Sequence, residues 1–127
     1  MGKVKIFPSD REWSNYVRTR DQWTCQRCNK QYQPPTSALH CSHFWSRGNW
    51  SVRYDDDNCE ALCYGCHSYL GGNPNEHHEY KLEKLGEERF EALRERRNDH
   101  KSGSRTYYLS KEFRKTIKEK MEKLDDR

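Results

Sequence analysis

Apolar residues recur at helical spacing near the start of the chain and again in its second half. A Ser-x-x-Glu capping pattern at residues 9–12 precedes the first stretch, where Trp13, Tyr16 and Val17 would lie on one side of a helix over residues 9–20. Further helices are predicted over 74–85, which begins after an asparagine, over about 87–98, and over 111–124. Both ends of the chain are therefore predicted to be helical.

The centre of the chain follows a different pattern. Residues 38–45 and 50–54 are rich in aromatic and β-branched residues, and a Ser-Arg-Gly-Asn turn sequence at 46–49 separates them. This pattern predicts the two strands of a hairpin. A polar loop over 55–58 follows, and a short helix is expected from the second cysteine pair to the Gly-Gly pair at 71–72. A Ser/Gly linker is expected over 101–105. Helical ends around a central hairpin predict an α+β fold.

The composition limits the size of the core. The chain has 127 residues, of which 31% are apolar and 35% are charged, so we expect one domain with a small core. Such domains commonly need a metal or disulfides for stability. The formal net charge of +4 permits a polyanionic partner without demonstrating one. The first residues contain no long apolar run, so no signal peptide or membrane span is expected, and the predicted compartment is the cytoplasm.

Four of the six cysteines form two Cys-x-x-Cys pairs, Cys25/Cys28 and Cys63/Cys66. In a chain without an export signal, this spacing indicates a structural zinc ion held by four thiolates, and disulfides are the weaker alternative. Such a site would hold together two segments that are far apart in the sequence. The remaining thiols, Cys41 and Cys59, are expected to be small buried hydrophobic residues, although Cys41 is close to two histidines in the sequence.

Histidines occur on the predicted first strand, at His40 and His43, and directly after the last cysteine, at His67. Two strands, a loop and a helix with histidine on the first strand and on the helix have the layout of a ββα metal nuclease. Hydrolysis of a phosphodiester requires a nucleophilic water and a divalent cation that neutralises charge on the phosphoryl group and the leaving oxygen. Histidine suits the role of base because its pKa lies near the working pH.

With these residues in place, the segment 23–72 resembles the HNH (ββα-metal) endonucleases, and most of all the phage recombination nucleases of the lambda NinG type. The resemblance rests on the order and spacing of four short motifs: Cys25-Gln-Arg-Cys28, Ser42-His43-Phe44, Asp57-Asn58 and Leu62-Cys-Tyr-Gly-Cys-His67. It implies a DNA phosphodiester hydrolase that acts in phage DNA processing or recombination. It also implies a structural Zn²⁺ and a catalytic Mg²⁺ or Mn²⁺.

The resemblance assigns roles to individual residues. His43 would be the general base, Asn58 would orient this histidine or contact the metal, and His67 would be a ligand of the catalytic cation. Ser42 is a departure, because the family usually has Asp or His at this position as the other cation ligand. His40, or a carboxylate from residues 55–57, is expected to supply the missing contact, or else water and substrate oxygens do so.

Two arginines and two tryptophans surround the predicted turn. Arg47 and Arg53 are expected to contact DNA phosphates, with pairing to the acidic residues 55–57 as the alternative. Trp45 and Trp50 would either lie along a sugar or base or fill the core. The basic residues of 111–123 are expected to form a solvated helix face that could add sequence-independent affinity.

Three parts of the chain are expected: an N-terminal helix (1–22), a zinc-stabilised nuclease core (23–72) and a C-terminal helical extension (73–127). His77 and His78 fall in the extension and are expected to be ordinary polar helix residues. DNA is the predicted partner, no membrane contact is expected, and monomer and homodimer both stay open. Two other functions are weighed: a non-catalytic zinc-ribbon DNA-binding or recombination accessory protein, which Ser42 favours, and a protein–protein zinc module with incidental histidines.

Overall fold

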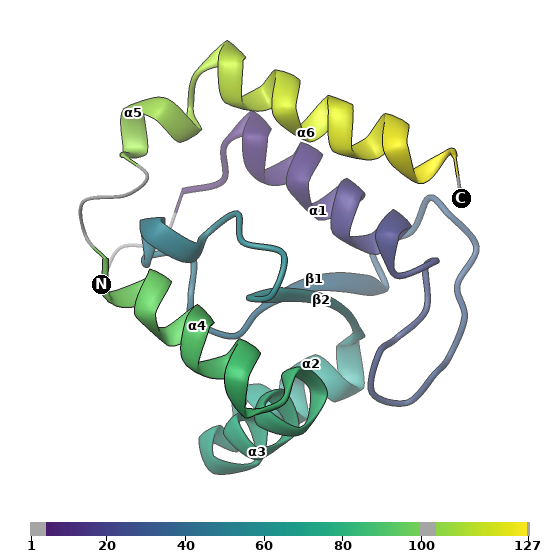
Figure 1. Cartoon of the computed structure of the whole chain (residues 1–127). Helices are drawn as coiled ribbons and strands as arrows, with labels where there is room; N and C mark the ends of the chain where they lie inside the picture. Colours follow the sequence, from purple (N-terminus) through teal and green to yellow (C-terminus); the bar gives the residue numbers. More distant parts are fainter. Residues whose placement is uncertain (1–4, 100–103, 127) are drawn as a thin grey trace.

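A two-stranded antiparallel sheet lies at the centre of the fold, with helices above and below it in the view of Figure 1. The computed structural model describes residues 5–99 and 104–126. The strands are β1 (Leu39–His43) and β2 (Cys59–Cys63), and the helices are α1 (Pro8–Arg20), α2 (Tyr64–Gly71), α3 (Pro74–Leu85), α4 (Glu87–Asn98), α5 (Arg105–Tyr108) and α6 (Lys111–Leu124), with a short 3-10 helix, η1 (Trp50–Val52). This combination of helices with a small sheet confirms the predicted α+β class.

The register of the sheet decides which side chains share a face. His43 lies opposite Cys59, and His40 lies opposite Leu62. Since side chains alternate along a strand, His40 and Ser42 project from one face of β1, whereas Cys41 and His43 project from the other. The helix α2 follows β2 without a loop, so His67 is placed one helical turn beyond the end of the sheet.

The predicted second strand over 50–54 is wrong. These residues form η1 and the turn after it, and the strand that pairs with β1 is Cys59–Cys63. The reason is that the aromatic residues at 50–54 pack around a buried charge instead of pairing in a sheet. The guanidinium of Arg53 lies 4.1 Å from the ring centroid of Trp50, and the Trp50 ring also contacts Phe7 at the start of α1.

The helices agree more closely with the sequence. α1, α3, α4 and α6 occupy the predicted segments, and Ser110 caps α6 by accepting a hydrogen bond from the Phe113 backbone N–H at 3.1 Å. At α1 the predicted cap is shifted, because the helix begins at Pro8 and the Asp10 carboxylate accepts from the Phe7 N–H at 2.7 Å. The expected linker at 101–105 lies mostly outside the described residues, and its last residue begins α5, which the pattern did not predict.

Two small cores hold the described parts together. In the first, α6 lies along α1, and α1 packs against both strands of the sheet (Figure 1); its buried members are Trp13, Tyr16, Val17, Cys59, Phe113 and Ile117. The second core surrounds the paired cysteines and contains Cys25, Leu39, Ala61, Leu62, Cys66 and Leu70. Each fully buried large apolar side chain contributes about 1.5–3 kcal/mol. Because the second core has few such side chains, burial alone stabilises it weakly.

Among the helices of residues 5–99 and 104–126, none combines the length and the apolar composition that crossing a bilayer requires.

Candidate functional site

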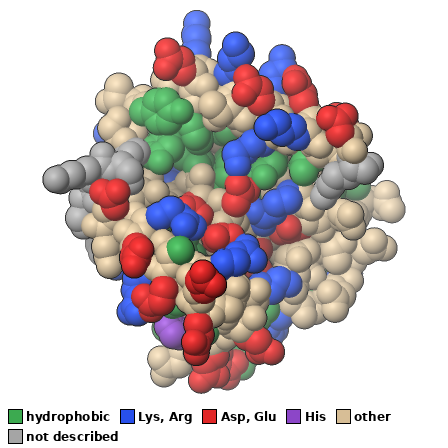
Figure 2. Space-filling model, viewed as in Figure 1, with side chains coloured by type: hydrophobic (Ala, Val, Ile, Leu, Met, Phe, Trp, Pro, Cys, Tyr) green, Lys and Arg blue, Asp and Glu red, His purple; other side chains and the backbone are tan. Residues whose placement is uncertain are grey.

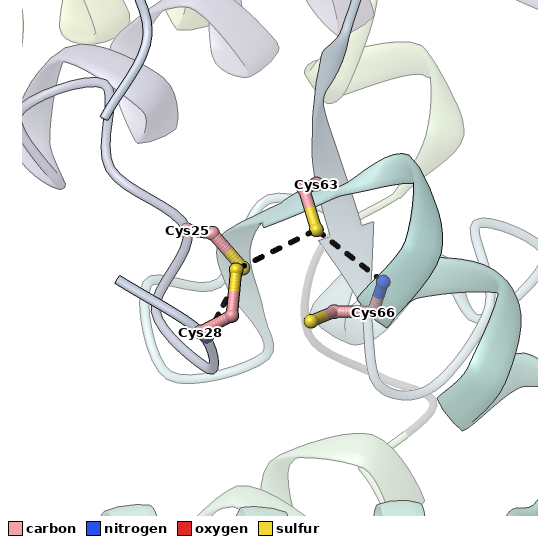
Figure 3. Close-up of side chains that lie close together, drawn as sticks. All are labelled: Cys25, Cys28, Cys63 and Cys66. Carbon is pink, nitrogen blue, oxygen red and sulfur yellow. Dashed lines mark hydrogen bonds between the residues drawn. The ribbon is translucent and has the colours of Figure 1, made fainter. Parts of the chain in front are cut away.

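The four paired cysteines converge on one point. Cys25 and Cys28 lie on the loop after α1, while Cys63 ends β2 and Cys66 lies in the first turn of α2 (Figure 3). Their sulfur atoms all lie within 4.8 Å of one another, and the Sγ atoms of Cys28 and Cys63 are 3.8 Å apart. Four sulfurs at about 2.3 Å from a tetrahedral zinc ion are about 3.8 Å apart from one another. The donor set therefore fits a structural zinc ion.

Backbone N–H groups also point at these sulfurs. The Cys28 N–H donates to Cys25 Sγ at 3.5 Å, and the Cys66 N–H donates to Cys63 Sγ at 3.4 Å. Burial raises the pKa of Cys25, but the N–H donors of Cys28, Cys63 and Arg27 outweigh it and lower the pKa to about 7. Since zinc binds the thiolate, this environment favours the form of the ligand that a metal requires.

A cleft of about 880 Å³ lies beside β1 and brings the three predicted histidines together. Its lining comes from two sides: Ile6, Asp10, Arg11, Ser14 and Arg18 from α1 and the segment before it, and His40, Cys41, His43, Ser46, Arg47 and His67 from β1, its following loop and α2. The residues on the second side are up to 27 positions apart in the sequence, so only the fold makes them neighbours.

His40 and His67 face each other across the junction of sheet and helix. Their Nδ1 atoms are 2.9 Å apart, and their rings are close to perpendicular, with an interplanar angle of 75°. Burial and the nearby charges of His40 and His43 lower the pKa of His67, which favours its neutral, lone-pair-bearing form. Two imidazoles whose nitrogens meet at one point are able to share a proton or to bind one cation.

His43 is held by its backbone surroundings. Its Nε2 lies 2.9 Å from the carbonyl oxygen of Arg53. A carbonyl only accepts hydrogen bonds, so Nε2 carries the proton and Nδ1 of the neutral ring carries the lone pair. Burial lowers the pKa of His43, but its contact with Cys59 and the Arg53 carbonyl raise it by more, and the net pKa lies above the ordinary value.

Cys41 and Cys59, the two cysteines outside the Cys-x-x-Cys pairs, lie beside His43. Cys59 is buried in the first core, and Cys41 is partly buried against it, which agrees with their expected role as small packing residues. Their positions in the sequence did not indicate that they could also be metal ligands. One ligand atom from each of Cys41, His43 and Cys59 lies within 4.8 Å of the others. The Trp13 ring N–H donates to Cys59 Sγ at 3.3 Å.

Asn58 stabilises the loop between the strands. Its side chain is fully buried, accepts from the Trp45 N–H, and donates to the carbonyls of Trp45 and Val52. With its amide engaged in this way, Asn58 has no exposed atom for a metal. Its effect on His43 is indirect, because the loop that it holds is the one that presents the Arg53 carbonyl.

The predicted phosphate contact of Arg53 is not compatible with its position. Its side chain is 1% exposed and forms a bidentate ion pair with Asp10, at 2.7 and 2.9 Å. Two further bonds run to the carbonyls of Lys5 and Arg47, so the guanidinium has no face left for a phosphate. Arg47 differs, because its partly exposed side chain lines the cleft.

Other residues considered from the sequence lie away from the cleft. Residues 55–57 pair with basic side chains of α1, α4 and α6, so their carboxylates do not reach the histidines. Ser42 is 2% exposed. His77 and His78 pack against Phe44, at ring-centroid distances of 4.9 and 6.3 Å, as ordinary helix residues do. His40 is therefore the one predicted candidate for the missing ligand that the fold brings to His67.

The sequence did not predict that α1 provides one wall of the cleft. Arg11, Ser14 and Arg18 are spaced at i, i+3 and i+7, on a side of the helix adjacent to the one that buries Trp13 and Val17. This polar stripe was visible in the sequence, but a solvated face has the same pattern. Only the packing of α1 across the sheet turns the stripe into a wall of the cleft.

The fold and its ligand clusters define a small α+β protein with a four-thiol centre and a histidine-lined cleft. The family model described as the bacteriophage lambda NinG protein matches residues 8–126. The chain therefore belongs to the NinG family, and the resemblance noted in its sequence is confirmed. It is also 32% identical over 63 residues to a protein of Lactococcus phage SK1 described as a probable HNH endonuclease. The matched segment covers 46% of this chain and 67% of that relative. No solved structure matched the chain.

Proposed function

We propose that the cleft is the active site of an HNH endonuclease that hydrolyses DNA phosphodiester bonds. The observation that carries the proposal is the meeting of His40, His43 and His67 in one cleft, with His40 and His67 in nitrogen-to-nitrogen proximity. Membership of the NinG family and similarity to a phage protein described as a probable HNH endonuclease support a role in phage DNA processing or recombination.

His40 and His67 would hold the catalytic cation. Two ligands at right angles and about 2.1 Å from an octahedral ion are about 3 Å apart, and the two Nδ1 atoms are separated by 2.9 Å. When bound, a divalent cation would neutralise charge on the phosphoryl group and the leaving oxygen. The Asp10 carboxylate also lines the cleft but is paired with Arg53, so water and substrate oxygens would complete the shell of the cation.

His43 would be the general base. Its Nε2 proton is committed to the Arg53 carbonyl, so Nδ1 is the atom that takes the proton of the attacking water. His40 and His43 leave opposite faces of β1, so the base and the cation ligands do not compete for one position. Asn58 acts as a positioning residue, through the loop that orients His43.

The thiol cluster would hold a structural zinc ion. All four positions of a tetrahedral ion would be filled by sulfur, which leaves none for substrate. The ion would fix α2 against the loop after α1, and so would keep His67 next to β1.

Cleavage of supercoiled plasmid tests the proposal. The parent protein, His43→Ala, His40→Ala and His78→Ala would be compared in Mn²⁺ and in Mg²⁺, with zinc content and circular dichroism measured on each. We expect nicking or linearisation by the parent and by His78→Ala, whose histidine is exposed and outside the cleft. His43→Ala should lose activity at every metal concentration, whereas His40→Ala should require more metal.

A non-catalytic DNA-binding protein is the second candidate, and the buried Ser42 in place of an Asp or His ligand favours it. DNA binding without cleavage by a folded, zinc-loaded parent, across both cations and both duplex and single-stranded substrates, would select this candidate. Cleavage that persists in His43→Ala would contradict the assignment of the base.

A further inference from the structure

The wall of the cleft on α1 carries charge that the chemistry proposed above does not use. Arg11 and Arg18 project from α1 toward the cleft, while Arg47 projects from the loop after β1 on the other side. Asp10 also lines the cleft, but the buried Arg53 compensates its charge. The walls therefore carry an excess of positive charge on both sides of His43.

The two arginines of α1 differ in what they contact. Arg18 donates to the carbonyls of Ser14, Thr36 and Leu39, and its guanidinium lies 4.7 Å from the ring centroid of Trp23. These bonds fix the segment that leads into β1, so the Arg18 guanidinium is already engaged. Arg11 is exposed, and its guanidinium forms no hydrogen bond or ion pair with the part of the chain that the structure describes. Its five N–H donors are available to a ligand.

Arg47 matches Arg11 on the opposite wall. Its backbone carbonyl accepts a bond from Arg53, which fixes the position of the residue, while its guanidinium likewise has no partner among residues 5–99 and 104–126. Arg47 and His43 line the same side of the cleft, the side that β1 and its following loop provide. An anion between Arg11 and Arg47 would therefore lie beside His43.

We propose that Arg11 and Arg47 form a two-sided phosphate clamp that positions the DNA backbone across the cleft, one guanidinium on each side of the phosphate presented to His43. This proposal rests on the proposed function and identifies a substrate-positioning residue on α1. Unpaired guanidinium groups bind phosphate oxygens through charge-assisted and often bidentate hydrogen bonds. Contacts of this kind fix the position of the strand without reading its bases, so the clamp confers affinity for any sequence.

The basic face of α6 is the principal competing surface. Lys115 and Lys118 are exposed there, beside a second groove between α1 and α6. That groove contains no histidine. On the face drawn in Figure 2, basic and acidic side chains are intermixed, so this view shows no continuous positive track. Lys115 therefore serves as a matched control for the loss of one positive charge outside the cleft.

The salt dependence of DNA binding tests the clamp. Fluorescence anisotropy with a labelled DNA duplex would be measured over a salt series in the His43→Ala background, which prevents cleavage. We expect Arg11→Ala to weaken binding several-fold and to reduce the slope of log affinity against log salt by about 1, the value for one lost phosphate contact. Arg11→Ala with Arg47→Ala should reduce it by about 2. Arg11→Lys should retain most of the slope, and Lys115→Ala should leave affinity and slope unchanged.

Two results would overturn the clamp: an unchanged slope in Arg11→Ala, or an equal reduction in Lys115→Ala, which would mean that any positive charge suffices. These results are independent of the plasmid assay. If the parent fails to cleave but Arg11 still sets the salt slope, the clamp holds and the nuclease proposal fails. If cleavage depends on His43 but Arg11→Ala binds as the background does, the clamp alone fails.

Discussion

The two groups of candidate metal ligands in this protein are built in opposite ways. The thiol cluster takes two sulfurs from each of two local Cys-x-x-Cys turns, and all its donors are alike. The histidine cleft takes side chains from both faces of β1 and from α2, and α1 forms its other wall. One cluster depends on short sequence spacings, and the other depends on strand register and helix placement.

This difference suggests separate roles: the thiol cluster would stabilise the fold, and the histidine cleft would carry out the cleavage. Four thiolates saturate a zinc ion and leave no position for a substrate, so the zinc ion proposed at the thiol cluster would contribute folding free energy. Two imidazoles occupy a minority of the positions around a cation and leave the others for water and phosphate oxygens. Changes at the first site should therefore affect folding, and changes at the second should affect cleavage with the fold retained.

Loss of one thiol should have the largest effect. We expect Cys63→Ser to abolish stoichiometric zinc binding and the cooperative thermal transition, because structural zinc ions contribute on the order of 10 kcal/mol. Zinc content by mass spectrometry and unfolding by circular dichroism would measure this. Cys41→Ser is the matched control, since Cys41 lies outside the thiol cluster, and it should keep one zinc per chain. A cooperative transition in zinc-free Cys63→Ser would remove the distinction between the two clusters.

Loss of the buried ion pair between Asp10 and Arg53 should have the second largest effect. Asp10→Ala leaves the Arg53 charge buried without its partner, so we expect a loss of about 3–5 kcal/mol in the free energy of unfolding, measured by urea denaturation, with zinc retained. Glu12→Ala removes an ion pair to Arg114 at the surface of the same helix and should cost less than about 1 kcal/mol. Equal losses in the two variants would show that the Asp10–Arg53 pair has no special role.

The same pair should make stability depend on pH. Burial raises the pKa of Asp10, but hydrogen bonds from Arg53, the Phe7 N–H and Tyr54 outweigh it and hold the pKa below its ordinary value. A lowered folded-state pKa stabilises the fold above the unfolded-state value, and this contribution is lost as pH falls through the folded-state pKa. The loss should be absent in Asp10→Ala.

A shift in the pH dependence of cleavage should be the smallest effect. Cys59→Val removes a contact that raises the pKa of His43 and keeps the burial that lowers it, so the pKa should fall. Because the base acts in its neutral form, the acid limb of the cleavage profile should move to lower pH. NMR titration of His43 would report the pKa directly. A limb that stays in place or moves to higher pH would contradict the assigned role of the Cys59 contact.

The helices and the cysteine centre were predictable because their signals are local. Pro, Asn, Ser and Gly at helix ends, and a two-residue gap between cysteines, act over a single turn of chain. The second strand was not predictable in the same way. The aromatic residues at 50–54 have strand propensity, but the burial of Arg53 against Asp10 requires a turn there, and β1 pairs with residues 59–63. Tertiary packing outweighed local propensity.

The candidate site shows the same division. His43, His67 and the four cysteines were expected from the motifs, and His40 was expected as one of the possible replacements for Ser42, beside a carboxylate of residues 55–57 or water and substrate oxygens. The place of Arg53 in the interior was not foreseen, since an arginine beside a turn normally faces solvent. Arg11 was overlooked because nothing in a polar helix face indicates which surface it will meet.

The sequence by itself determined the NinG-type motif order, the four-thiol centre and the boundaries of most helices, since each depends on residues within a few positions of one another. The tertiary structure alone decided which strand pairs with β1, which arginine is buried, and that α1 forms the second wall of the cleft. These outcomes depend on long-range contacts, in which a buried charge must find its partner and each helix must cover an apolar face.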